Sequence, residues 1–144
     1  AGLASIFGRG AREQLARAPG LIELMQQAAT LYKDLAPSGG LSESRAHTDE
    51  AVKIYAEFRR QNSLESLALP VGDGKSLFLL KAGSEDRDYA NRVRRFDWEG
   101  FYTNYGSFFT HLRQQLVEQY THVFIHSRTG VTDTCRISTR APPE

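Results

Sequence analysis

The part of the sequence with the clearest potential for chemistry is a polar loop that follows a short apolar run. Val123, Phe124 and Ile125 are apolar, and the stretch 126–133 that comes next is mostly polar and contains Gly130. This order is typical of a buried strand that delivers a loop to an active site. The alternative interpretation is an ordinary turn around the glycine.

A second candidate for phosphate chemistry is Gly74-Lys75-Ser76, which resembles the close of a P-loop. The complete pattern requires a glycine five residues before Gly74, where this chain has Leu69. It also requires a helix after the loop, because the helix N-terminus supplies donors to the phosphates, whereas the β-rich run SLFLL follows here. Since Asp-Gly strongly favours a tight reversal, we predict a hairpin turn at this position.

Histidine and cysteine side chains give weaker signals. His122 and His126 are four residues apart on the predicted strand, so their side chains would point to the same side. A zinc site needs further ligands at a recognisable spacing, and the other histidines, His47 and His111, do not provide one. We therefore interpret the histidines as structural. Cys135 adjoins an arginine, which can lower a thiol pKa, but a single cysteine without a partner is more often inert.

A cluster of arginines occurs in the sequence NRVRRF. It contains Arg92, Arg94 and Arg95. The acidic residues that balance it are Glu85, Asp86 and Asp88. This balance indicates a solvated helix face rather than a nucleic-acid interface.

The composition indicates an ordinary globular protein. The 144 residues suffice for one domain with a real core, and the formal net charge of +1 gives no indication of nucleic-acid or membrane binding. One cysteine excludes an internal disulfide and fits a reducing compartment, so we expect a cytoplasmic protein. No apolar stretch approaches the roughly 18 residues of a membrane span, and no signal peptide is evident at the start.

The elements that must position these residues alternate between helical and β-type patterns. Apolar spacing predicts helices over 21–35, 86–96 and 107–120, and Thr48 is a suitable cap for a further helix that begins at Asp49 and ends near Gln61. Strand-like runs cover 64–71, 76–83 and 123–125. The small and polar stretch 36–48 predicts a flexible loop, and 135–144 predicts a polar tail. Together they indicate one domain of α/β class, over residues 1–144, with helices flanking a sheet.

The longest recognisable motif runs from Phe96 to Thr134 and reads FDWEGFYTNYGSFFTHLRQQLVEQYTHVFIHSRTGVTDT. It resembles the end of the nucleotide-binding domain of bacterial MinD/ParA-type P-loop ATPases. More narrowly, it is similar to the KGGVGKT group that is fused to NB-ARC, TIR or tetratricopeptide-repeat regions. Upstream, SLFLLKAGSEDRDYANRV resembles the family's strand ending in Ala-Gly and the helix beyond it. The resemblance implies a partial three-layer α/β fold and a parent activity that uses ATP and Mg²⁺.

The resemblance also implies roles for the polar loop. In the family, an aspartate before Ser-Arg-Thr-Gly holds the water shell of Mg²⁺, and the glycine offers its N–H near the γ-phosphate. These positions correspond to His126 and Gly130. The other residues of the implied nucleotide-binding loop are Ser127, Arg128, Thr129 and Asp133. Gly130 suits its role because no side chain blocks the phosphate, whereas His126 lacks the hard carboxylate oxygens that Mg²⁺ prefers.

Two departures from the family pattern shape the functional expectation. The sequence has no counterpart of KGGVGKT, and the polar stretch 135–144 stands where members continue into an apolar strand. We therefore expect a fragment or degenerate form of an ATP-binding switch domain that binds no cofactor and does not hydrolyse ATP alone. One alternative is a non-catalytic protein–protein interaction module, through the helix 107–120 or an open sheet edge. Another is an unrelated small α/β protein. The expected partners are further copies of this chain or other parts of the parent protein, and neither nucleic acid nor a membrane.

Overall fold

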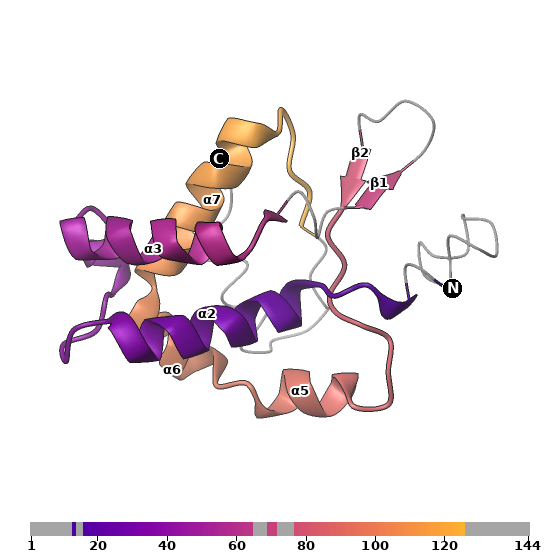
Figure 1. The fold of residues 1–144 in the computed structure, drawn as a ribbon, viewed down its shortest axis with the longest axis horizontal. Helices are drawn as coiled ribbons and strands as arrows, with labels where there is room; N and C mark the ends of the chain where they lie inside the picture. Colours follow the sequence, from indigo (N-terminus) through magenta and orange to yellow (C-terminus); the bar gives the residue numbers. More distant parts are fainter. Residues whose placement is uncertain (1–12, 14–15, 65–68, 72–76, 126–144) are drawn as a thin grey trace. The chain divides into compact units, whose positions relative to one another are not determined.

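The computed structural model describes residues 13, 16–64, 69–71 and 77–125. Figure 1 shows their elements. The helices are α2 (Leu21–Leu35), the 3-10 helix η2 (Glu43–Arg45), α3 (Asp49–Gln61), α5 (Tyr89–Arg95), α6 (Trp98–Tyr105) and α7 (Ser107–Gln119). The strands are β1 (Leu69–Val71) and β2 (Leu77–Leu79).

The predicted three-layer α/β fold is wrong. The part of the chain that the structure describes is mostly helical, and its sheet consists of β1 and β2 alone. The two strands pair antiparallel, with Pro70 opposite Phe78. The β-type runs 64–71 and 76–83 therefore pair locally, through β1 and β2, across a short connection. The helices bury their aromatic side chains against one another instead of against a sheet.

The hairpin agrees with the turn predicted between its strands. Residues 72–76, which include Gly74-Lys75-Ser76, lie outside the described residues, but the chain enters them from β1 and leaves them into the antiparallel β2. A phosphate-binding loop would open a helix at this point. The strand that follows instead favours the hairpin over a P-loop.

The chain divides into two compact units. One comprises residues 1–30 and 59–96, and the other comprises residues 31–58 and 97–144. The division falls inside α2 and inside α3, so each of these helices contributes residues to both units. We call the first the α5 unit and the second the α7 unit, and each is described by itself.

Aromatic side chains form the core of the α7 unit. Phe108 is fully buried, and its ring lies 5.1 Å from that of Phe58, 5.6 Å from Phe101 and 5.7 Å from Tyr32, measured between centroids. All three contacts are edge-to-face, the geometry that aromatic quadrupoles favour. Burial of rings from four helices gives this unit a core without any strand.

The buried face of α7 differs from the predicted one. The sequence indicates a stripe through Phe109, Leu112, Leu116 and Tyr120, joined by Phe108 and Val117. Phe108 is buried as expected, but Val117 is 54% exposed and the polar Gln115 is buried instead. Gln115 is tolerated because its Oε1 accepts a 2.7 Å hydrogen bond from the Tyr55 hydroxyl. A paired amide can therefore occupy a core position that a purely apolar pattern would assign elsewhere.

The segment between α2 and α3, predicted as a loop, is bound to α6 and α7 by its backbone. Leu41 is fully buried, its N–H donates to Asn104 O at 2.6 Å, and its carbonyl accepts from Ser107 N at 3.0 Å. At the end of the segment the Thr48 hydroxyl accepts from Ala51 N at 3.3 Å, which confirms the predicted cap of α3. None of the helices within the described residues combines the length and the apolar character of a membrane span.

Candidate functional site

The predicted nucleotide-binding loop lies outside the described residues. This applies to His126 at the implied metal position and to Ser127, Arg128, Thr129, Gly130 and Asp133. Cys135 lies outside them as well. The structure therefore describes the approach to the loop, residues 120–125, and the rest of the helical framework.

The approach to the loop is not the buried strand that the sequence indicates. Residues 123–125 belong to neither β1 nor β2, and the Phe124 and Ile125 side chains are 89% and 54% exposed. The helix α7 ends at Gln119, and Tyr120 is already extended, with φ −128° and ψ 136°. A buried strand needs neighbouring strands on both sides, and the described residues provide none here.

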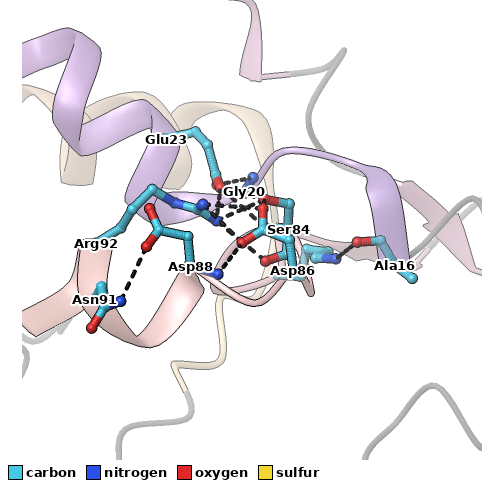
Figure 2. A network of polar contacts seen from close by, with 9 residues as sticks. Ala16, Gly20, Glu23, Ser84, Asp86, Asp88, Asn91 and Arg92 are labelled. Carbon is cyan, nitrogen blue, oxygen red and sulfur yellow. Dashed lines mark hydrogen bonds and ion pairs between the residues drawn. The ribbon is translucent and has the colours of Figure 1, made fainter.

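The most connected polar group of the α5 unit is centred on Arg92 (Figure 2). We define the Arg92 cluster as Glu23, Ser84, Asp86 and Arg92. Arg92 Nη1 donates to both Asp86 carboxylate oxygens at 2.9 and 3.0 Å. Its Nη2 donates to Glu23 Oε1 at 3.1 Å and to Ser84 Oγ at 2.8 Å. The guanidinium of Arg92, in α5, thus links α5 both to α2 and to the segment that follows β2. It uses the fork geometry that distinguishes arginine from lysine.

Glu23 has a second role as a helix cap. Its Oε2 accepts from the backbone N–H of Gly20 at 2.8 Å, which is one half of a capping box. The next two N–H groups, of Leu21 and Ile22, donate to the carbonyls of Lys81 and Ala82, both at 2.9 Å. The first turn of α2 is therefore satisfied by protein groups and is not open to an anion.

The hydroxyl of Ser84 connects the two carboxylates. Ser84 Oγ lies 2.8 Å from Glu23 Oε1 and 2.9 Å from Asp86 Oδ2, and it accepts from Arg92 Nη2. A serine hydroxyl carries one proton, so it donates to one carboxylate at a time. The Ser84 backbone N–H, 3.1 Å from Glu23 Oε1, keeps that carboxylate paired in either case.

The electrostatics of the Arg92 cluster keep its charged groups ionised. Hydrogen bonds from Arg92 and Ser84 lower the pKa of Asp86 to about 2, and the hydrogen bond to Asp86 raises the pKa of Arg92. Partial burial raises the pKa of Glu23, but the hydrogen bonds from Gly20 and Ser84 outweigh it, so the net pKa lies below the ordinary value. General acid–base catalysis needs a pKa near the working pH. The cluster is therefore suited to holding structure and not to proton transfer.

A second polar arrangement surrounds His111 in the α7 unit. Its Nε2 lies 2.8 Å from the Ala46 carbonyl, and its ring stacks on Tyr55 with centroids 5.1 Å apart. Burial lowers the pKa of His111, partly offset by the Ala46 hydrogen bond, and His47 lowers it further. This geometry agrees with a structural role for His111. In the part of the chain that the structure covers, no three His, Cys, Asp or Glu side chains are grouped as a metal site would require.

Sequence reasoning identified part of the Arg92 cluster. The sequence predicted a charge balance on a solvated helix face; in the structure Arg92 pairs with Asp86, one of the balancing residues, but its side chain is only 18% exposed. Glu23 was missed, because it is 69 residues away from Arg92 in the sequence. The available signal was a glutamate three residues after Gly20 at a helix start, which is the spacing of a capping box.

Comparisons of the chain with protein-family models, with curated proteins and with solved structures gave no match.

Proposed function

We propose that this chain is part of a nucleotide-dependent switch domain of the MinD/ParA type that does not hydrolyse ATP by itself. The observation that carries the proposal is the sequence order from Phe96 to Thr134: an aromatic-rich helical stretch, the apolar run 123–125 and then His-Ser-Arg-Thr-Gly. A cytoplasmic location accompanies the proposal, because nucleotide switches act where ATP is available and the chain has a single cysteine.

What supports the proposal among the described elements is their order along the chain. β2 is followed by Ala82-Gly83, then by α5, then by α6 and α7, and then by the apolar run. The resembling family has the same order of an Ala-Gly strand end, a helix and an aspartate-ended apolar run. A three-layer sheet is not part of the proposal, since the described residues contain only the hairpin.

For this chain by itself, the proposal is negligible binding of ATP and no hydrolysis. Phosphoryl transfer depends on backbone donors and a lysine around the phosphates and on a correctly placed Mg²⁺. The 144 residues contain no KGGVGKT motif to supply the phosphate donors and the lysine. Position 126 has an imidazole where the family has the carboxylate that positions Mg²⁺. Calorimetric titration with Mg-ATP should therefore give no measurable isotherm, and a clear micromolar isotherm would contradict this part of the proposal.

A gain-of-function experiment tests the relationship itself. We would fuse a strand and KGGVGKT loop to the chain and compare His126 with His126→Asp in steady-state ATPase assays. In the fused protein the aspartate form should exceed the histidine form by about 100-fold or more, the range that loss of one electrostatic group commonly removes. His126→Asp without the fused loop is the matched control, and it should stay inactive. Equal rates in the fused pair would mean that position 126 is not the metal position.

A second candidate function is a non-catalytic interaction module. The observation that favours it is the exposure of the large apolar side chains Phe124 and Ile125 directly after α7. Apolar residues that are adjacent and uncovered commonly mark contacts with another chain. This candidate predicts association in the absence of any nucleotide, which separates it from the switch proposal.

A further inference from the structure

The helices α6 and α7 follow one another directly, and Gly106 is the single residue between them. Gly106 has φ −56° and ψ −25°, which lie in the right-handed helical region. The backbone dihedral angles at this junction therefore do not separate the two helices. The reason for the interruption must lie in the hydrogen bonds around the junction.

The backbone of Leu41 takes up the hydrogen-bonding groups at the junction. In an uninterrupted helix, Ser107 N would donate to Thr103 O, and Asn104 O would accept from the amide four residues later. Here Ser107 N donates to Leu41 O at 3.0 Å, and Asn104 O accepts from Leu41 N at 2.6 Å. The segment between α2 and α3 is thus inserted into the hydrogen-bond ladder of the helix. We call residues 40–43 the strap.

The strap depends on a glycine at its first residue. Gly40 has φ +69°, in the left-handed region that other residues rarely adopt. A Cβ at this position would lie 2.6 Å from Asn104 O, the same carbonyl that accepts from Leu41 N. A side chain at position 40 would therefore act directly on the contact between the strap and the helices.

The strapped arrangement leaves a buried hydroxyl at the junction without a partner. Ser107 is fully buried, and its Oγ has no hydrogen-bond partner in the part of the chain that the structure describes. Unpaired buried polar groups are rare in native proteins, because burial removes their bonds to water. In an uninterrupted helix, a serine hydroxyl can bond to the carbonyl four residues earlier, which is Thr103 O here. The uninterrupted helix would therefore satisfy a group that the strapped arrangement leaves unpaired.

We propose that the junction is a two-state device. In one state the strap is bound and α6 and α7 are separate; in the other the strap is released and residues 98–119 form one helix. The two bonds to Leu41 are exchanged for intrahelical bonds, so the states differ little in their number of hydrogen bonds, as a bistable element requires. The device belongs to the α7 unit, goes beyond the proposed functions and does not depend on nucleotide binding.

The test is residue-resolved amide hydrogen exchange of the full chain, measured by nuclear magnetic resonance. Gly40→Ala should speed exchange at Leu41 by about 10-fold or more, because the left-handed conformation and the contact with Asn104 O penalise only the strapped state. The Ser107 amide should stay protected, because it replaces Leu41 O by Thr103 O. Gly39→Ala is the matched control, since its Cβ would meet only the end of the Arg45 side chain, and it should leave both amides unchanged.

A second variant should change exchange in the opposite direction. Ser107→Ala removes the unpaired hydroxyl from the strapped state and the additional hydrogen bond from the released state. Exchange at Leu41 should therefore become slower than in the wild type. Circular dichroism should show the helical signal in every variant.

Loss of protection at Leu41 and Ser107 together in Gly40→Ala would overturn the proposal, because the junction would then open without forming one helix. Unchanged exchange at Leu41 in that variant would overturn it as well. If Gly40→Ala does not fold, Ser107→Ala decides: equal or faster exchange at Leu41 would contradict the two-state device.

Discussion

His111 is a half-buried side chain whose protonation makes the stability of the α7 unit depend on pH. Its ring stacks on Tyr55, and its Nε2 contacts the carbonyl of Ala46 at the end of the segment before α3. The hydrogen bond is compatible with a neutral ring that donates from Nε2. Burial disfavours the charged ring, so the pKa lies below its ordinary value of 6.5 in the folded chain.

We therefore expect the free energy of unfolding to fall as the pH drops through 6.5. The unfolded chain binds a proton at His111 there, while the folded chain binds it only at lower pH, so stability is complete above this value and is lost below it. Urea unfolding at about pH 7.5 and about pH 5.5 measures the loss. His111→Gln should reduce the difference between the two pH values. The matched control is His122→Gln, at an exposed position, and it should show the same pH-dependent loss of stability as the wild type. If His111→Gln also showed the full wild-type loss, His111 would not be its source.

At the scale of elements, the start of α2 depends on close approach to the segment after β2. A Cβ on Gly20 would collide with the backbone carbonyl of Lys81 and would lie 2.7 Å from the nitrogen of Gly83. These are backbone atoms that cannot rotate away, and the same carbonyl accepts the Leu21 N–H. A glycine at this position is needed for steric reasons and not for unusual dihedral angles.

Gly20→Ala should lower the free energy of unfolding by about 1–3 kcal/mol, the usual range for a side chain forced into an occupied space. Gly39→Ala is the control, because its added Cβ would meet only the end of the Arg45 side chain, at 3.3 Å. That variant should stay within about 0.5 kcal/mol of the wild type. Thermal or urea unfolding of the two variants makes the comparison. If Gly20→Ala were as stable as Gly39→Ala, the start of α2 would tolerate displacement from residues 81–83.

Most of the helices were predictable from local patterns, although α6 was not predicted, and the contacts between elements were not predictable. The spacing of Met25, Ala28 and Tyr32 predicts α2, and Thr48 predicts the start of α3, because helix periodicity and capping are encoded within a few residues. The link from Glu23 to Ser84 spans 61 residues and has no local signal beyond the capping glutamate. The apolar run 123–125 was predicted as a buried strand because a polar, glycine-containing loop follows it, and such a local pattern cannot supply the neighbouring strands that a sheet needs.

At the scale of the whole molecule, helix-on-helix aromatic packing replaces the expected sheet. The elements assigned among the described residues are helices and one short hairpin. The far-ultraviolet circular dichroism spectrum of the full chain should therefore have the strong double minimum of a helical protein. A weak single minimum of the kind that sheet-rich proteins give would contradict this arrangement and would restore the α/β interpretation.

The carbonyls of Lys81 and Ala82 have a consequence for the order of events during synthesis. They accept the N–H groups of Leu21 and Ile22 at the start of α2, some sixty residues earlier in the chain. On a ribosome, α2 emerges long before these acceptors exist, and an isolated helix of this length is marginal in water. Its first turn should therefore stay frayed on the nascent chain and become protected against amide hydrogen exchange only after the residues of β2 and the segment beyond it have left the exit tunnel. Stalled nascent chains that end before and after that segment should differ in exchange at Leu21 and Ile22, while amides in the middle of α2 change less.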